Sequence, residues 1–470
     1  MLRLRFLIRS SAAFIFIGLA VSQANAQTQL PADITEKIDK LATETLARTG
    51  VPSASIAVVK DGQIVYVKAY GEAKLEPKTP ATSQMRYSIG SISKQFTAAA
   101  ILLLQEQRKL SLDDKVAKYI PDLTRANEVT IRQLLSHTSG YQDYWPQDYV
   151  MKPMLGPTTA RKIMDTWAKK PLDFEPGTKW QYSNTNYVIA GAIVEKVARM
   201  SLLQFLQQKV FTPLGMTSVL NIDQQRLTES DPTGYMRYAL GPSRVAPKEG
   251  KGWLFAAGEL AMTAEDLAKW DISIIDQKLM RPASYLQLGR GVVLKNGVAT
   301  QYALGVNVTS QGGHRALSHG GEVSGFTAQN IVLPDDRVAV VVLTNQDAAS
   351  AAGPIASGIP PMLFATNDPA TAAKLEQAKK IFEDLQHGKI DRSLFTENAN
   401  AYFSEQALAD FKNSLGPLGK PQSFTQTSQS LRGGMVGRVY QVRFAQKTIR
   451  AWTYEMPNGK LEQFQVAVGN

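Results

Sequence analysis

A serine and a lysine three residues apart are the first candidates for chemistry in this sequence. Ser91 and Lys94 lie in the run Gly-Ser-Ile-Ser-Lys-Gln-Phe of residues 90–96, just before an apolar helix predicted over residues 97–107. Residues three apart share one helix face, with Cβ atoms about 5–6 Å apart, so the amine reaches the hydroxyl. A free lysine, with a pKa of about 10.4, is protonated at neutral pH. Burial beside the serine would lower the lysine pKa and make the amine a proton acceptor.

Two further stretches carry groups that would complete such a site. Tyr182 and Asn184 follow a turn-rich run and precede a predicted helix. A tyrosine there can pass a proton where nearby cations favour the phenolate, and an asparagine can hold a substrate amide. His319, Gly320 and Gly321 are predicted to follow a strand, where they would supply a titratable group and a backbone edge without side chains. Each motif is common alone, so the prediction depends on their order and spacing.

The elements around these motifs predict an α+β fold. A helix is expected to begin at Pro31-Ala32-Asp33 and to stop at Gly50. Residues 110–226 are predicted to be mostly helical, and residues 348–364 to form a closing helix. Strands are predicted over residues 53–60, 63–70, 302–309, 316–319, 326–333 and 338–343.

These strands predict one antiparallel sheet, flanked by helices, with a mostly helical region inserted between its two halves. The sheet is begun near residue 53 and completed near residue 343. Ser91 precedes the inserted region, Tyr182 lies within it and His319 follows it. We therefore expect the three motifs to meet in an active site at the seam between sheet and helices.

The two ends of the chain predict separate units. Residues 1–26 carry three arginines, an apolar run over residues 12–21 and a final Ala-Asn-Ala, which is typical of a cleavable signal peptide and predicts a periplasmic or secreted protein. The apolar run is well short of the roughly 20 residues that span a bilayer. We expect no membrane span after signal cleavage. The main domain is then expected over residues 27–366.

A small C-terminal α+β domain is predicted over residues 370–470, after the boundary Asn-Asp-Pro of residues 367–369. Two helices followed by four antiparallel strands resemble, in element order, the cone-shaped fold of the nuclear transport factor family. Arg450, Trp452 and Tyr454 alternate along one predicted strand. A half-exposed sheet face explains this alternation as well as a binding groove does.

Composition excludes several other classes of site. The chain has no cysteine, so disulfides and thiolate metal sites are impossible. The net charge is +11, but the basic residues are scattered, which favours a solvated basic surface over nucleic-acid binding. The sequence contains no G-x-S-x-G, no H-E-x-x-H and no G-x-x-x-x-G-K. We expect neither a metal nor a cofactor.

Together with their flanking runs, these motifs resemble the serine β-lactamase and penicillin-binding protein superfamily, in its class C β-lactamase-like branch. Ser91 and Lys94 match its S-x-x-K box, and Tyr182 and Asn184 match the Y-x-N of that branch. The flanking runs are Leu-Leu-Ser-His-Thr-Ser-Gly at residues 134–140, Glu-Pro-Gly at 175–177, Thr-Ala-Glu-Asp-Leu at 263–267 and Gly-Phe at 325–326. The resemblance covers residues 33–365 and implies a β-lactamase/transpeptidase-like fold.

The resemblance also implies a role for each residue. Ser91 would be the nucleophile that becomes acylated, and Lys94 its base or electrostatic partner. Tyr182 would move the proton between Ser91, the leaving group and a water, and Asn184 would orient a substrate amide. The backbone N–H groups of Ser91 and Glu322 would form the oxyanion hole. His137, within the 134–140 run, is interpreted as structural.

One position departs from the pattern. His319 stands where penicillin-binding proteins and true class C β-lactamases have lysine, and histidine is mostly neutral at pH 7. Within this branch, a histidine at this position resembles the pattern of esterases and of D-amino-acid-directed peptidases or amidases. Weak or absent β-lactam turnover is therefore expected. The expected substrate is a small ester, amide or peptide, with cell-wall material as a further candidate. Two alternatives stay open: a β-lactamase or penicillin-binding D,D-peptidase, and a non-catalytic regulator that binds peptides or the cell wall.

Overall fold

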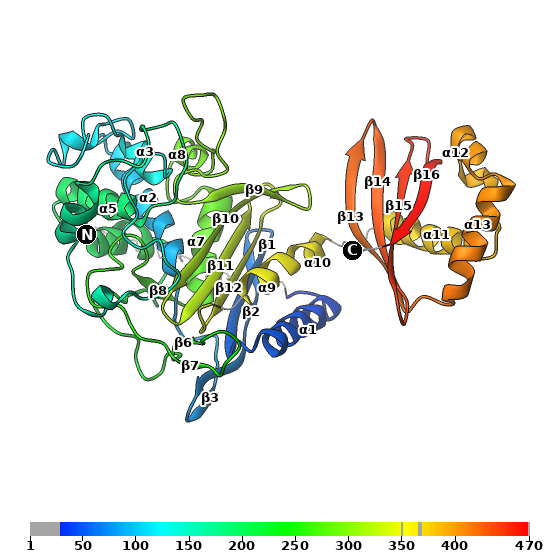
Figure 1. Ribbon diagram of the computed structural model, residues 1–470, viewed down its shortest axis with the longest axis horizontal. Coiled ribbons are helices and arrows are strands. Elements are labelled where there is room, and N and C mark those ends of the chain that lie inside the picture. Colours follow the sequence, from blue (N-terminus) through cyan, green and yellow to red (C-terminus); the bar gives the residue numbers. More distant parts are fainter. Residues whose placement is uncertain (1–28, 349–350, 365–368, 469–470) are drawn as a thin grey trace, which may run out of the picture.

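A seven-stranded antiparallel sheet forms the centre of the main unit (Figure 1). The computed structural model describes residues 29–348, 351–364 and 369–468. The strand order is β3-β2-β1-β12-β11-β10-β9. The strands are β1 (Ser53–Lys60), β2 (Gln63–Leu75), β3 (Lys78–Pro80), β9 (Asn307–Gln311), β10 (His314–Val323), β11 (Phe326–Leu333) and β12 (Val338–Thr344). Strands from the two ends of the unit therefore meet where β1 pairs with β12.

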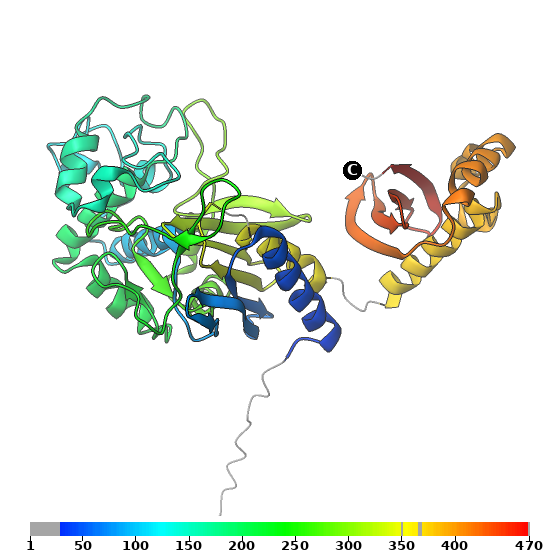
Figure 2. The same ribbon diagram turned by 60° about the horizontal axis from the view of Figure 1, so that its bottom comes forward.

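Helices cover both faces of this sheet, and the central strands are buried on both sides. Ile56 and Val58 pack toward α1 (Ala32–Thr49), α9 (Ala352–Gly358) and α10 (Pro360–Phe364). Ala57 and Val59 belong to the core on the opposite face, with α2 (Ser93–Glu106) and α7 (Ala264–Asp276). Alternate residues of a strand point to opposite faces, so one apolar run supplies two cores. Figure 2 shows α1 and the sheet from a second direction.

The inserted region packs on the side of the sheet where α2 lies. α2 is buried from Ser93 to Leu104, which explains why its sequence is apolar almost all round. The other helices of the main unit are α3 (Ile131–Leu135), α4 (Ala160–Ile163), α5 (Asn184–Ala198), α6 (Leu202–Leu206) and α8 (Pro282–Leu288). Short strands form two small sheets: β4 (Tyr87–Ser88), β5 (Leu220–Asn221) and β8 (Leu260–Met262), and β6 (Tyr235–Met236) with β7 (Arg244–Val245).

The C-terminal residues form a four-stranded antiparallel sheet with helices and a hydrophobic core of its own. Its helices are α11 (Pro369–Gln386), α12 (Glu397–Tyr402) and α13 (Glu405–Leu415), and its strands are β13 (Ser423–Arg432), β14 (Met435–Arg443), β15 (Thr448–Glu455) and β16 (Leu461–Val468). Phe382, Phe403 and Tyr440 are buried in that core. Arg450, Trp452 and Tyr454 lie on the more exposed face of β15, while Ala451 between them is buried.

The predicted α+β fold is confirmed, although several of its elements differ: α2 begins at Ser93 rather than at residue 97, and β2 continues to Leu75. The closing helix is two helices, α9 and α10, and the C-terminal unit has a third helix, α12. The strand expected from residue 302 begins only at Asn307. The predicted signal peptide lies outside the described residues. Within the described ranges, no helix has both the length and the apolar character needed to cross a bilayer.

Candidate active site

The Ser91 and Lys94 side chains lie within hydrogen-bond distance of each other at the start of α2. Ser91 occupies the 3₁₀ turn Gly90–Ile92, and Lys94 lies in the first turn of the helix that follows. Lys94 Nζ is 3.0 Å from Ser91 Oγ, 2.8 Å from Asn184 Oδ1 and 2.8 Å from the Ala257 carbonyl oxygen. Three acceptors match the three N–H bonds of an ammonium group. A neutral amine would keep two of these bonds and accept the third from the serine hydroxyl.

Burial shifts Lys94 toward that neutral form. The side chain is fully buried, and burial lowers its pKa to about 7 although the negative charge of Asp143 opposes the shift. Removing an ammonium group from water disfavours its charged state, which explains the direction. At neutral pH the amine and ammonium forms are therefore comparably populated. Such a group is suited to accept a proton from Ser91 and to return it.

Tyr182 lies over the same pair. Lys94 Nζ is 5.0 Å from the centre of the Tyr182 ring. Burial and the charge of Asp143 hold the pKa of Tyr182 well above its usual 10, and hydrogen bonding to Ser91 only partly offsets them. The condition that cations favour the phenolate is therefore not met. Tyr182 is a phenol at neutral pH, so it can donate a proton, whereas Lys94 is the group able to accept one.

Asp143 orients Asn184, and no motif in the sequence predicted this role. Asp143 Oδ1 accepts hydrogen bonds from the backbone N–H groups of Asn184 (2.9 Å) and Trp145 (3.1 Å). Asp143 Oδ2 is 3.3 Å from Asn184 Nδ2. These bonds turn the Asn184 amide so that its oxygen faces Lys94 and its nitrogen faces the carboxylate. Asp143 comes three residues after the Leu-Leu-Ser-His-Thr-Ser-Gly run and belongs to no spaced motif.

His319 is neutral, and the protein itself occupies both of its ring nitrogens. Nδ1 lies 2.5 Å from the Gly320 carbonyl oxygen, which can only accept, so Nδ1 carries the proton. Nε2 therefore accepts from the Tyr302 hydroxyl at 2.8 Å. Burial, together with the charge of Lys94, lowers the pKa of His319 to about 4. The ring has no N–H left for a substrate carboxylate in this arrangement.

The expectation that His319, Gly320 and Gly321 follow a strand is wrong. All three lie inside β10, which pairs with β11 as far as Val323. Its other neighbour, β9, pairs with it only as far as Ser318. The histidine therefore comes just beyond the residue that pairs with Asn307, the first residue of β9, and Gly321 lies where β10 passes the turn that carries Ser91.

Two glycines allow that close passage. A Cβ atom on Gly321 would lie 1.9 Å from the Ile89 carbonyl oxygen and 3.4 Å from Ser91 N. A Cβ atom on Gly90, whose φ is +50°, would lie 2.6 Å from Glu322 N. The backbone nitrogens of Ser91 and Glu322 are thus brought to one place by two segments that only glycine lets approach. This is the arrangement that a two-donor oxyanion hole requires.

His137 lies behind Tyr182. Its ring centre is 4.2 Å from that of Tyr182, and its Nδ1 accepts a hydrogen bond from Ser183 N at 3.2 Å. Burial and the nearby Lys94 hold the His137 pKa well below its usual value. A neutral, fully buried ring that bonds to the backbone beside Tyr182 fits the structural interpretation.

A cavity of about 350 Å³ opens in front of Ser91. Ser91, Tyr182 and Asn184 line it, whereas His319, Gly320 and Gly321 do not. Its remaining lining includes the four carboxylates Asp143, Asp148, Glu322 and Asp347 and the aromatic residues Tyr144, Trp145 and Tyr149. Among the described residues that line this catalytic cavity there is no lysine or arginine. The described ranges also contain no cluster of three side chains able to hold a metal ion.

Comparison with known proteins fits this geometry. Residues 38–356 match the family model described as Beta-lactamase. The chain belongs to the Beta-lactamase family. This member is 30% identical over 298 residues to a D-aminopeptidase of Brucella anthropi, a match that covers 63% of this chain and 56% of the relative. It is 29% identical over 319 residues to penicillin-binding protein 4* of Bacillus subtilis (strain 168), covering 65% of this chain and 70% of that protein. The chain therefore spans little more than half the length of the matched D-aminopeptidase.

Solved structures agree on the fold. A D-amino acid amidase from Ochrobactrum anthropi SV3, complexed with L-phenylalanine amide, superposes with a TM-score of 0.60 at 24% identity and covers 71% of this chain and 97% of its own. The octameric penicillin-binding protein homologue from Pyrococcus abyssi gives a TM-score of 0.63 at 21% identity and covers 92% and 99%. The family match over residues 38–356 confirms the predicted superfamily.

Proposed function

We propose that this protein is a serine hydrolase that forms an acyl-enzyme at Ser91 with amides or peptides of D-amino acids or with small esters. One observation carries the proposal: a buried lysine with a pKa of about 7 lies 3.0 Å from a serine hydroxyl at the wall of a cavity. A lysine poised in this way activates the serine at neutral pH. The names of the matched D-aminopeptidase and amidase support the same class of substrate.

Each residue of the site has its own role in acylation and deacylation. The neutral Lys94 amine accepts the proton of Ser91 as Oγ bonds to the substrate carbonyl carbon. The N–H groups of Ser91 and Glu322 stabilise the negative oxygen that forms, an interaction whose loss typically costs about 10²–10³ in rate. Tyr182 donates its phenolic proton to the leaving amine or alcohol and regains one from Lys94. In deacylation a water gives a proton to the same pair as its oxygen bonds to the acyl carbon, and the pair returns a proton to Ser91 Oγ as the bond between Oγ and the acyl carbon breaks.

Charge in the catalytic cavity favours a substrate with a free amine near the scissile bond. Of the described residues, four carboxylates and no lysine or arginine line this cavity. Burial raises the pKa of Asp143, Glu322 and Asp347, so each gains from a nearby cation. An ammonium group supplies that cation, whereas a carboxylate beside these residues is repelled. The neutral His319, with both nitrogens engaged, offers a β-lactam carboxylate no compensating charge.

The test compares acyl donors on the purified protein. D-alanine amide, D-phenylalanine amide, their L-enantiomers, p-nitrophenyl acetate and nitrocefin are assayed with the unaltered protein, with Ser91→Ala and with the control Ser83→Ala. We expect Ser91-dependent turnover of the esters and D-amides, fluorophosphonate labelling that only Ser91→Ala abolishes, and little hydrolysis of nitrocefin. Full activity in Ser91→Ala would refute the proposed mechanism.

The other readings give different results in the same assay. Rapid nitrocefin turnover would favour a β-lactamase, and a long-lived penicillin adduct would favour a penicillin-binding D,D-peptidase. No reaction with any acyl donor would favour a regulator that binds peptides or cell-wall material. A periplasmic or secreted location is also part of the proposal, and N-terminal sequencing of the mature protein tests it.

A further inference from the structure

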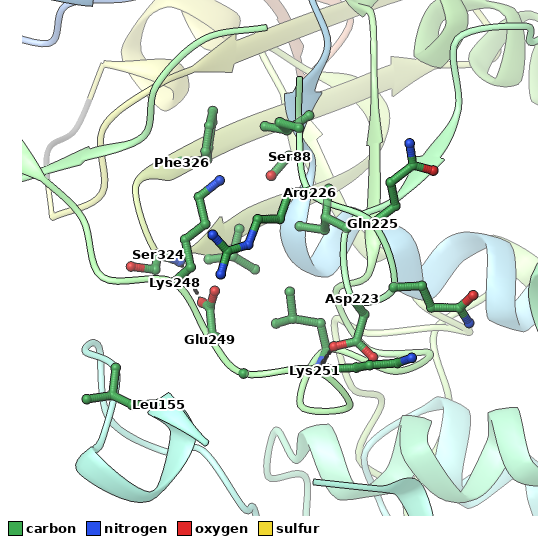
Figure 3. A pocket seen from close by; sticks show the side chains of 16 residues that line it. Ser88, Leu155, Asp223, Gln225, Arg226, Lys248, Glu249, Lys251, Ser324 and Phe326 are labelled. Carbon is green, nitrogen blue, oxygen red and sulfur yellow. Dashed lines mark hydrogen bonds between the residues drawn. The ribbon is translucent and has the colours of Figure 1, made fainter. Parts of the chain in front are cut away.

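A second cavity, of about 230 Å³, adjoins the catalytic one. The two cavities share Leu254, Val323 and Ser324 as lining residues. Val323 and Ser324 directly follow Glu322, whose backbone N–H belongs to the proposed oxyanion hole. A substrate held at Ser91 therefore needs to extend only past these shared residues to enter the second cavity. Figure 3 shows the second cavity with the side chains that line it.

Three cations line this second cavity, and two of them, Arg226 and Lys248, form no ion pair within the described residues. The side chains of Arg226 and Lys248 enter the space from different loops (Figure 3). Neither forms an ion pair or a side-chain hydrogen bond with any residue of the described ranges. Elsewhere in the main unit, Arg86 and Arg337 are paired with carboxylates. Burial lowers the pKa of Lys248, and the positive charge of the nearby Arg226 lowers it further.

Two carboxylates in the same wall interact with these cations, but they are fewer than the cations and are also engaged by the backbone. The charge of Glu249 opposes the burial that lowers the pKa of Lys248, and the charge of Lys251 opposes the burial that raises the pKa of Asp223. Asp223 Oδ1 accepts hydrogen bonds from the backbone of Gly252 (2.8 Å) and Leu254 (3.1 Å). Glu249 Oε1 accepts one from Ser324 N at 2.8 Å (Figure 3). Asp223 thus holds the backbone of residues 252–254 and Glu249 that of Ser324, and burial raises the pKa of both acids. Two carboxylates face three cations, so positive charge remains available for a ligand.

We infer that the second cavity is an anion subsite in which Arg226 and Lys248 bind a carboxylate of the substrate, beyond the acidic cavity that faces its ammonium group. The inference rests on the proposed function and adds a second charge to the substrate. Arginine and lysine donors suit a carboxylate, which both can reach in a shared concave space. The cleft would then select a zwitterionic chain rather than a simple amine.

The test uses two pairs of esters that differ in one carboxylate. On the acyl side, mono-p-nitrophenyl glutarate is compared with the p-nitrophenyl ester of glutaramic acid. On the leaving-group side, 4-acetoxybenzoate is compared with 4-acetoxybenzamide. The acylation rate of Ser91 is measured for the unaltered protein, for Arg226→Gln and Lys248→Gln, and for the control Lys209→Gln on an exposed surface outside both cavities. Each measurement is repeated at high salt.

We expect the carboxylate member of one pair to react faster with the unaltered protein. Each of Arg226→Gln and Lys248→Gln should reduce that advantage about fivefold, as should high salt, because the cations are partly exposed. Lys209→Gln should leave it unchanged. The pair that responds tells whether the anion belongs to the acyl group or to the leaving group.

Two results would overturn the inference. In the first, both pairs react at Ser91 without any preference for the carboxylate. In the second, a preference for the carboxylate survives both substitutions. In either case the hydrolase proposal is retained and the anion subsite is rejected. If no ester acylates Ser91, the hydrolase proposal fails and the subsite fails with it. The presence or absence of Ser91 acylation distinguishes the two failures.

Discussion

The main unit and the C-terminal unit differ in what they bury. Lys94, His137, Glu259, Asp271 and His319 are all buried in the main unit, whereas in the described part of the C-terminal unit the only buried polar residue is Thr453. Burying an ionisable group is costly unless its hydrogen bonds and charge are satisfied, so a protein seldom does it without a function. The C-terminal core is made of aromatic and aliphatic side chains that need no such support. The main unit therefore has the buried ionisable groups expected of a catalytic unit, whereas the core of the C-terminal unit is stabilised by apolar packing.

Removal of the buried amine should have the largest effect. Lys94→Met replaces the proposed base with a side chain of similar length and should lower the rate of Ser91 acylation by at least about 10³-fold, since base and nucleophile act as a unit. Stopped-flow release of p-nitrophenol measures it. The matched control is Lys412→Met, an exposed lysine of the C-terminal unit, which should react normally. If the Lys94→Met protein acylates Ser91 at a normal rate, Lys94 is not the base, and its burial would not distinguish the main unit as the catalytic one.

Truncation of the C-terminal core should affect stability alone. Phe382 is 1% exposed, and Phe382→Ala should cost about 3–5 kcal/mol of unfolding free energy in that unit through the cavity it leaves. Urea denaturation followed by circular dichroism measures the loss. The acylation rate of Ser91 in the absence of urea should stay within about twofold of the unaltered value. A large fall in that rate would mean that the C-terminal core supports catalysis.

Asp143→Asn should alter both the rate and its pH dependence. Loss of the carboxylate weakens the hold on the Asn184 amide, and we expect acylation to fall about tenfold, the cost of one or two charge-assisted bonds. The negative charge of Asp143 raises the Lys94 pKa, so its removal should move the acid limb of the pH profile to lower pH. If acylation is slower but the acid limb of the pH profile stays at the same pH, Asp143 acts only by positioning Asn184.

The pH profile of the unaltered protein should follow Lys94. Since the neutral amine is the base and its pKa is about 7, acylation should rise about tenfold between pH 6 and pH 8. His319, with a pKa of about 4, is neutral over that whole range and should not contribute. Rates with p-nitrophenyl acetate, corrected for spontaneous hydrolysis, give the profile. A flat profile would contradict Lys94 as the base.

Tyr302→Phe should give the smallest change. It removes the hydroxyl that donates to His319 Nε2 and leaves a buried acceptor without a donor, which costs about 1–3 kcal/mol. Thermal unfolding should shift down by a few degrees while acylation stays near normal, because neither residue is assigned a proton transfer. An unchanged unfolding temperature would indicate that the buried hydrogen bond between Tyr302 and His319 contributes little to the stability of the main unit.

The sequence predicted the parts of the site that depend on local spacing. Ser91 and Lys94 are one helical turn apart, so their contact follows from the helix alone. The roles of Asn184 and Glu322 were predicted from the resemblance of their motifs to the family boxes and not from local spacing. The continuation of β10 through Gly320 and Gly321 was missed, since two glycines usually indicate a turn and only pairing with β11 keeps them in a strand.

The residues that the sequence did not reveal are those defined by long-range contacts. Asp143 contacts Asn184 from 41 residues away, and Tyr302 contacts His319 from 17 residues away. Nothing in the sequence around Asp143 or Tyr302 distinguishes either residue from one with a solvated side chain. The charges of the two cavities likewise come from loops that are close only in the folded chain.

The two glycines at the crossing of β10 and the Ser91 turn have a consequence for control of this protein. With no side chain between them, the strand and the turn are in direct backbone contact, so a shift of either would displace the other. We expect the nucleophile and the carbonyl-polarising groups to move together, which favours regulation by admitting or excluding the substrate at the mouth of the cleft.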